Sequence, residues 1–166
     1  VIEKSAMHNI KSLLDFYIHR TEGKSSYVIV QDYVEGAEEG DVRVIMLNGQ
    51  PIGALRRRPA QGDARSNISA GGTVEKYKLT NADKILCKKV GEKLVRDGIY
   101  FAGLDLIGGK LIEVNVLSPG TITDINKLNN TKLQRKIVTY LERVVSEVKN
   151  KTNKSELVKL ENVTIS

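Results

Sequence analysis

The chain has 166 residues, of which 40% are hydrophobic and 5% aromatic, and its formal net charge at pH 7 is +6. A chain of this length can bury one hydrophobic core, so we expect one domain or a large piece of one. Its longest apolar runs, such as YVIV at 27–30, are far shorter than the roughly 20 apolar residues of a transmembrane helix, which excludes a membrane-spanning protein.

The start of the chain and its single cysteine indicate a piece of a cytoplasmic protein. The first residues, VIEKSAMHNI, contain no initiator Met and no signal-peptide pattern, so we expect further polypeptide upstream of Val1. Cys87 cannot form an internal disulfide, which favours a reducing compartment. We therefore expect a cytoplasmic protein with no membrane partner.

Hydrophobic periodicity predicts alternating helices and strands in the first part of the chain. Apolar residues at helical spacing indicate an amphipathic helix over 6–20, and SYVIVQDYV is typical of a strand over 26–34. Two strands over 41–58 flank Asn48 and Gly49, which are the strongest short signal for a β-hairpin.

A helix, a second hairpin over 102–120 and a final helix over 131–149 follow. Thr80, with Asp83 three residues later, predicts the N-cap of the first of these helices, and Gly98 predicts its end. We expect Cys87 to lie beside its inner face. That face is expected to carry Ile85, Leu86, Val90 and Leu94.

These elements predict an α+β fold in which an antiparallel sheet is flanked by helices. Residues 1–150 are expected to form one domain. Residues 151–166 are polar and lack an apolar stripe, so we expect them to be a C-terminal extension.

The second hairpin, AGLDLIGGKLIEVNVLSPG, separates polar from apolar positions. Alternate residues of a strand share a face, and Asp105, Glu113 and Asn115 all fall at odd positions. They stay on one face if Asp105 pairs with Glu113, which requires an odd loop, most simply Gly108–Lys110. Gly103 shares this face and should leave room there for a ligand.

Two carboxylates placed directly across a strand pair repel each other, so we expect a cation between them. Magnesium binds carboxylate oxygens while it keeps waters and substrate phosphates, which makes Asp105, Glu113 and Asn115 a candidate metal site. The alternative is a solvent-facing polar stripe on an ordinary amphipathic hairpin. The spacing alone does not choose between them.

Four motifs occur in an order that resembles the C-terminal part of an ATP-grasp ligase, most closely bacterial glutathione synthetase. They are VQDYV, GDVRVIMLNGQPI, an arginine-rich loop ending in RSNISAGG, and GLDLIGGKLIEVNVLSPG. The resemblance covers the chain from about residue 20 to about residue 145. Related ligases that add amino acids to a peptide or protein C-terminus share similar RSN and SPG endings, so the family is better defined than the substrate.

The resemblance implies an ATP-dependent ligation of a carboxylate to an amine. ATP phosphorylates the carboxylate, the amine attacks the acyl phosphate, and ADP and phosphate leave. In glutathione synthetase the acid is γ-glutamylcysteine and the amine is glycine. The implied partners are ATP, magnesium or manganese, and two small-molecule substrates. The resemblance does not decide whether the protein forms a homo-oligomer.

The resemblance also implies roles for single residues. Asp105, Glu113 and Asn115 match the metal ligands. Arg43 matches the arginine that faces the transferring phosphate, and Arg65 and Asn67 match residues of a loop that closes over the site. The remaining matches are Gln31, Asp32, Tyr33 and Asn115 for the nucleotide, and Arg57 and Ser118 for substrate.

Three consecutive arginines leave the register of the substrate-binding arginine open. The resemblance selects Arg57. A two-residue turn at Asn48–Gly49 would instead place Arg43 on one face with Arg56 and Arg58. The loop over 57–72 contains three glycines and few apolar side chains, so we expect it to be a mobile lid.

An ATP-grasp enzyme also has a substrate domain and a small subdomain with two lysines and a glycine-rich loop, and we expect both in the polypeptide upstream of Val1. We therefore expect this chain to be the magnesium-binding portion, inactive without the missing N-terminal part of the same polypeptide. The rival hypothesis is a non-enzymatic basic module that binds a polyanion through LRRRPAQGDAR. No aromatic residue interleaves that arginine run to stack on bases, which argues against nucleic acid.

Overall fold

A computed structural model describes residues 11–12, 15–16, 32–60 and 72–152, and the chain divides into two units, Val1–Val34 and Glu35–Ser166. In the first unit, residues 11–12 and 15–16 are helical, in agreement with the predicted helix. Residues 32–34 are not in a strand, so the strand predicted over 26–34 does not reach its predicted end. The remainder of both segments lies outside the described residues.

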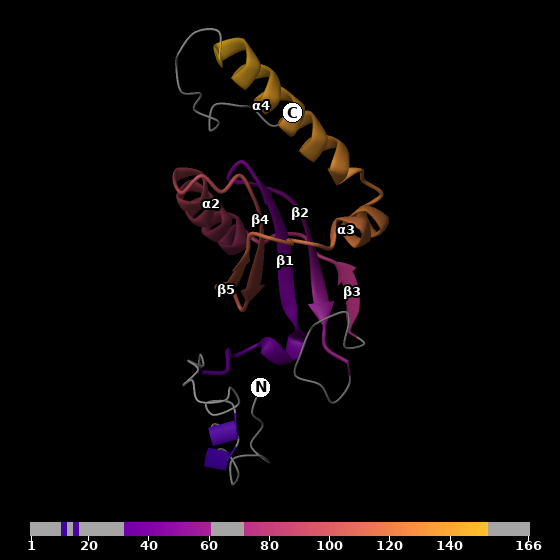
Figure 1. The fold of residues 1–166 in the computed structure, drawn as a ribbon. Coiled ribbons are helices and arrows are strands. Elements are labelled where there is room, and N and C mark those ends of the chain that lie inside the picture. Colours follow the sequence, from indigo (N-terminus) through magenta and orange to yellow (C-terminus); the bar gives the residue numbers. More distant parts are fainter. Residues whose placement is uncertain (1–10, 13–14, 17–31, 61–71, 153–166) are drawn as a thin grey trace. The chain divides into compact units, whose positions relative to one another are not determined.

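The second unit contains a five-stranded antiparallel sheet with the strand order β3-β2-β1-β4-β5 (Figure 1). A short 3-10 helix, η2 (Ala37–Glu39), precedes the sheet. The strands are β1 (Asp41–Leu47), β2 (Gln50–Arg58), β3 (Thr73–Lys76), β4 (Phe101–Ile107) and β5 (Lys110–Asn115), and the helices are α2 (Asn81–Arg96), α3 (Ile122–Asn129) and α4 (Leu133–Thr152). The α+β prediction is confirmed, whereas β3 and α3 were not predicted.

Each face of the sheet has its own hydrophobic core, and helices cover both (Figure 1). Alternation along β1 sends Val42, Val44 and Met46 to the α2 side, where they pack with Cys87 and Leu94 of that helix. On the other side, Ile45 packs with Ile125 of α3 and Leu133 of α4, and Leu47 packs with Tyr140 of α4. The helices that the structure describes include none with the length and apolar content to cross a membrane.

The predicted boundaries of α2 are correct, but its predicted inner face is partly wrong. Thr80 and Asp83 form a full capping box, and Gly98 follows the helix with φ of 79°. Ile85 is 71% exposed, whereas Cys87 is completely buried. The helix faces the sheet through Gly91, where an added Cβ would lie 2.1 Å from the carbonyl oxygen of Gly49. Because the helix approaches closely at Gly91, its buried face runs through Cys87 and Gly91, and Ile85 faces solvent.

Both hairpins combine a two-residue turn with a β-bulge. Asn48–Gly49 and Gly108–Gly109 form the turns, all four residues with positive φ. Three residues after each turn one residue has no cross-strand partner, Ile52 in β2 and Ile112 in β5. The predicted three-residue loop at Gly108–Lys110 is therefore wrong, because the extra residue lies within the strand.

Candidate active site

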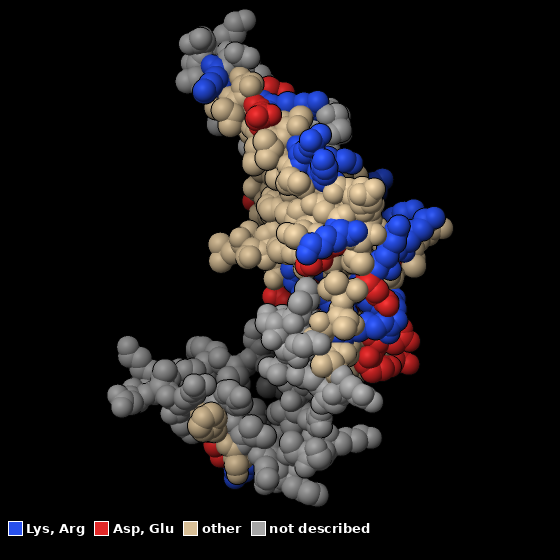
Figure 2. Space-filling model, turned by 90° about the vertical axis from the view of Figure 1, so that its right-hand side faces the viewer, with Lys and Arg blue, Asp and Glu red and all other residues tan. Residues whose placement is uncertain are grey.

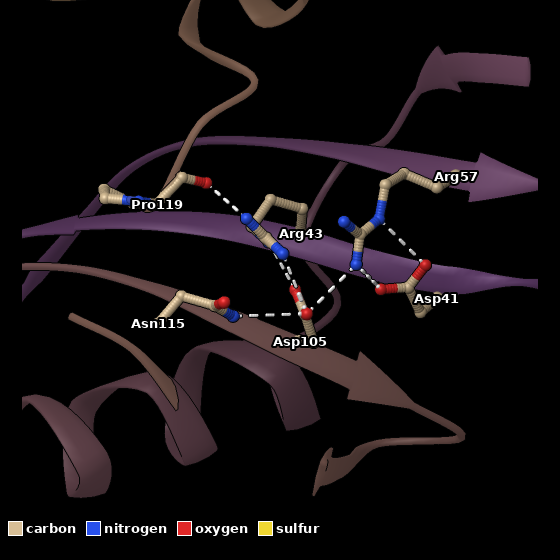
Figure 3. A network of polar contacts seen from close by, with 6 residues as sticks. All are labelled: Asp41, Arg43, Arg57, Asp105, Asn115 and Pro119. Atoms are coloured by element: carbon tan, nitrogen blue, oxygen red, sulfur yellow. Dashed lines mark hydrogen bonds and ion pairs between the residues drawn. The ribbon is translucent and has the colours of Figure 1, made fainter. Parts of the chain in front are cut away.

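A cluster of buried charges lies where β1, β2 and β4 run side by side on the sheet face that carries Ile45. The pairing of β1 with β2 sets Asp41 opposite Arg57, and its pairing with β4 sets Arg43 opposite Asp105. Directly opposite residues share a face, so two acids and two bases meet on adjacent strands. Figure 3 shows these side chains turned toward one another.

Arg43 binds Asp105 through one edge of its guanidinium group. Its Nε donates to Oδ1 of Asp105 and its Nη2 donates to Oδ2 at 2.9 Å, while its Nη1 donates to the carbonyl oxygen of Pro119 (Figure 3). The two charged side chains are only 8% and 6% exposed. Such a bidentate, buried pair fixes the orientation of the carboxylate.

Arg57 lies between two carboxylates. Its Nε donates to Oδ1 of Asp41 at 3.0 Å, and its Nη2 donates to Oδ2 of Asp41 and lies 3.0 Å from Oδ2 of Asp105. Burial lowers the pKa of Arg57, but the hydrogen bond and charge of Asp41 and the charge of Asp105 outweigh it, so the net pKa is raised. Arg57 therefore stays a cation, and the four charges of the cluster balance.

The bulge at Ile52 settles which of the three consecutive arginines reaches this cluster. With one unpaired residue in β2, Arg57 shares the face of Arg43, and the expectation from an unbulged turn that Arg56 and Arg58 would do so is wrong. Arg56 lies 4.9 Å above the ring of Tyr77 on the other face, and Arg58 pairs with Glu75 at 3.0 Å.

The three residues of the predicted metal site converge as expected. Asp105 is the cross-strand partner of Glu113, and Asn115 is the partner of Gly103 two pairs further along, on the same face. The Asn115 amide nitrogen donates to Oδ2 of Asp105 at 3.3 Å (Figure 3). Asp105 is 5% exposed, whereas Glu113 is exposed and makes no hydrogen bond or ion pair with a described residue. One buried and one exposed carboxylate thus lie side by side.

The cation expected between the two carboxylates is supplied in part by arginine. Both Arg43 and Arg57 neutralise Asp105, so charge repulsion alone does not require a metal ion there. Among the described residues, no group of three or more His, Cys, Asp or Glu side chains is placed to hold a metal. Two carboxylates and one amide oxygen still form a donor set of the kind that a hard cation takes.

Gly103 makes room for protein atoms rather than for a ligand. An added Cβ would lie 3.1 Å from Cα and Cβ of Pro119 and 3.2 Å from Cδ of Arg43. The absence of a side chain at Gly103 therefore allows the segment after β5 to lie on the sheet. There the Pro119 carbonyl oxygen accepts a hydrogen bond from Arg43. Ser118, beside it, is exposed.

The structure describes the remaining predicted site residues only in part. Gln31, Arg65 and Asn67 lie outside the described residues, as do residues 61–71 of the predicted lid. Asp32 and Tyr33 are exposed residues of the first unit.

Asp41 was missed by the reasoning from sequence, although it is 5% exposed and paired with Arg57. One signal was available. Gly53 interrupts the second strand of the hairpin, and a glycine inside a strand often marks a bulge. A bulge at this point would have predicted that Asp41 faces Arg57.

Comparison with known proteins gives a consistent family match. A sequence model described as "Prokaryotic glutathione synthetase, ATP-grasp domain" matches residues 1–130. The chain is 40% identical over 133 residues to the glutathione synthetase of Thermosynechococcus vestitus, which covers 80% of this chain and 41% of the relative. It is 44% identical over 116 residues to that of a Nostoc species, covering 70% and 36%, and 47% identical over 115 residues to that of Gloeobacter violaceus, covering 69% and 36%. The chain thus spans about two fifths of the length of these curated relatives.

Proposed function

Because the chain belongs to the prokaryotic glutathione synthetase ATP-grasp family, we propose that its polypeptide joins γ-glutamylcysteine to glycine in an ATP-dependent reaction. In this reaction ATP phosphorylates the γ-glutamylcysteine carboxylate, and the glycine amine then displaces phosphate from the acyl phosphate. This chain would be the metal-binding portion of that polypeptide, with residues 1–150 in the ATP-grasp domain and residues 151–166 as an extension.

Asp105, Glu113 and Asn115 are the proposed ligands of magnesium or manganese. The exposed Glu113 carboxylate has no partner among the described residues, and no described residue donates a hydrogen bond to the Asn115 amide oxygen. A bound divalent ion would neutralise phosphate charge and orient the phosphates. Asp105 would join the ligands by exchanging an arginine contact for the ion.

The arginines of the cluster are proposed to bind the reacting groups. Arg43 is held rigidly by Asp105 and the Pro119 carbonyl, which suits a group that must meet developing charge without reorganising. Arg57 is proposed to bind the acid substrate. The further proposed roles are Arg65 and Asn67 on a closing loop, Ser118 at the substrate, and Gln31, Asp32, Tyr33 and Asn115 at the nucleotide.

The observation that carries the proposal is the placement of Arg43 and Arg57 against Asp105, beside Glu113 and Asn115, on one face. Phosphoryl transfer depends mostly on positioning and on charge neutralisation. Cations fixed next to a set of oxygen ligands provide both. In a solvent-facing polar stripe, Asp105 would be exposed and would not be paired with two arginines.

The test is ADP release by the complete polypeptide. We expect ADP to form only when ATP, a divalent ion, γ-glutamylcysteine and glycine are all present, and the 166-residue chain alone to form none. Turnover with the C-terminal peptide of a protein as acid, in place of γ-glutamylcysteine, would instead indicate an amino-acid-adding ligase. Substantial turnover by the 166-residue chain would contradict its role as a portion of the site.

A basic polyanion-binding module gains little support from the surface. On the face seen in Figure 2, the described Lys and Arg side chains form separate groups, and several have acidic side chains beside them. Binding of any polyanion with a steep dependence on salt concentration would favour that alternative. Binding that requires both nucleotide and a divalent ion would favour the ligase.

A further inference from the structure

We infer that Asp41 is a positioning residue that holds Arg57 in the orientation in which it meets substrate. This role rests on the proposed function of Arg57. It adds a residue that the motifs did not single out. Asp41 acts through the arginine and need not touch a substrate itself.

The geometry of the pair supports a positioning role. Asp41 lies directly opposite Arg57 in the β1–β2 pairing and accepts hydrogen bonds from its Nε and Nη2, with the Nε bond at 3.0 Å. The two side chains are 7% and 14% exposed, so water competes weakly for these bonds. A bidentate pair of this kind fixes the plane of the guanidinium group. The third nitrogen, Nη1, makes no hydrogen bond to a described residue (Figure 3) and is available to an anion.

The two carboxylates beside Arg57, those of Asp41 and Asp105, differ in their other partners. Asp105 already accepts hydrogen bonds from Arg43 and Asn115 and is also a proposed metal ligand. If a divalent ion were bound by an Asp105 oxygen, the contact of that carboxylate with Arg57 would weaken. Asp41 has no hydrogen bond or ion pair with any other described residue, so it can keep Arg57 in place during that exchange.

Kinetics of the complete polypeptide test the role through a double-mutant cycle. We expect Asp41→Asn to raise KM for γ-glutamylcysteine roughly tenfold or more, because a buried charged hydrogen bond is weakened. KM for ATP should change by less than about twofold. In an Arg57→Gln background, Asp41→Asn should have less than about a twofold further effect, since its target is gone. Additive effects, or an increase in KM for ATP that persists in the Arg57→Gln background, would overturn the inference.

A structural readout separates this inference from the proposed function. In nitrogen-15 NMR spectra of the complete polypeptide, the Nε proton of Arg57 should exchange slowly with water and should exchange at least about tenfold faster in Asp41→Ala. Glu75→Gln is the matched control, because it removes the carboxylate partner of the neighbouring Arg58 on the other face and should leave the Arg57 signal unchanged. Equal exchange in wild type and Asp41→Ala would refute positioning by Asp41. Absent turnover together with faster exchange in Asp41→Ala would reject only the proposed reaction.

Discussion

Asp105 and Glu113 are direct cross-strand partners, yet Asp105 is buried between two arginines and Glu113 is exposed without a described partner. Two carboxylates of one cross-strand pair thus lie in two different environments. Substitutions at the two positions should therefore separate stability from activity.

Glu113→Gln should abolish turnover while it leaves the fold intact. The proposed metal ion loses one charged ligand, and we expect ADP formation to fall at least about a hundredfold. Because Glu113 is exposed, the free energy of unfolding should change by less than about 0.5 kcal/mol. ADP release and thermal unfolding measure the two effects, with Glu142→Gln on the exposed surface of α4 as control. Turnover near that of the wild type would remove Glu113 from the site.

Asp105→Ala should instead destabilise the fold. The substitution leaves Arg43 and part of Arg57 as buried cations without their shared counter-charge, which costs about 3 kcal/mol or more. Urea denaturation should therefore show a lower midpoint for Asp105→Ala, whereas Glu113→Ala should unfold close to wild type. Equal midpoints for the two variants would mean that the arginines do not depend on Asp105.

Gly103→Ala should disturb the segment that follows β5. The new methyl group would lie 3.1 Å from Pro119 and 3.2 Å from the Arg43 side chain, so one of them must move. We expect a loss of about 1–3 kcal/mol in the free energy of unfolding. Urea denaturation measures it, and Leu117→Ala in the same segment should be neutral because Leu117 is 97% exposed. If Gly103→Ala were as stable as wild type, the segment that contains Pro119 would be able to move without a measurable loss of stability.

Thr80→Ala should weaken the start of α2. The Thr80 hydroxyl accepts from the Asp83 backbone N–H at 3.1 Å, and the Asp83 carboxylate accepts from the Thr80 backbone N–H at 2.9 Å. Removing the hydroxyl should cost about 1 kcal/mol of stability, measured by urea denaturation. Lys84→Ala, one turn later on the exposed side, should cost much less. A larger cost for Lys84→Ala would contradict the capping role.

Cys87 should be unreactive in the folded protein and should make stability depend on alkaline pH. Burial, with a smaller effect of the Asp83 charge, raises the pKa of the thiol from 9.0 to about 11. Iodoacetamide at pH 8 should modify the unfolded protein much faster than the native one, because only the thiolate reacts. Rapid modification of the native protein would contradict this burial.

The sign of the pH effect follows from proton binding. Between about pH 9 and pH 11 the folded state keeps the Cys87 proton that the unfolded state loses, so stability falls as pH rises through this range. Urea midpoints measured from pH 8 to pH 11 should therefore decrease more steeply for wild type than for Cys87→Ala. Identical slopes would show that Cys87 is not the titrating group.

Features that depend on a few neighbouring residues were predictable. Asn48–Gly49 forms its turn because both residues tolerate positive φ, and Thr80 caps α2 because its partner Asp83 is three residues away. The alternation of polar and apolar residues in the second hairpin likewise predicted that Asp105, Glu113 and Asn115 share one face. In contrast, β3 has only four residues and its place depends on pairing with β2, so no local pattern indicated it.

The pairing of the two hairpins shows where local information ends. Asp105 and Glu113 can share a face only if an odd number of residues between them is unpaired. The prediction of an odd number is correct. The pattern does not say whether the odd residue lies in the turn or in the strand. In both hairpins it lies in the strand, at Ile112 and at Ile52, and the position of Ile52 brings Arg57 beside Asp41 and Asp105. The position of a bulge is a property of the strand pairing and not of one residue's neighbours in the chain, so the sequence determined the identity of the charged residues, and long-range pairing selected which of them meet.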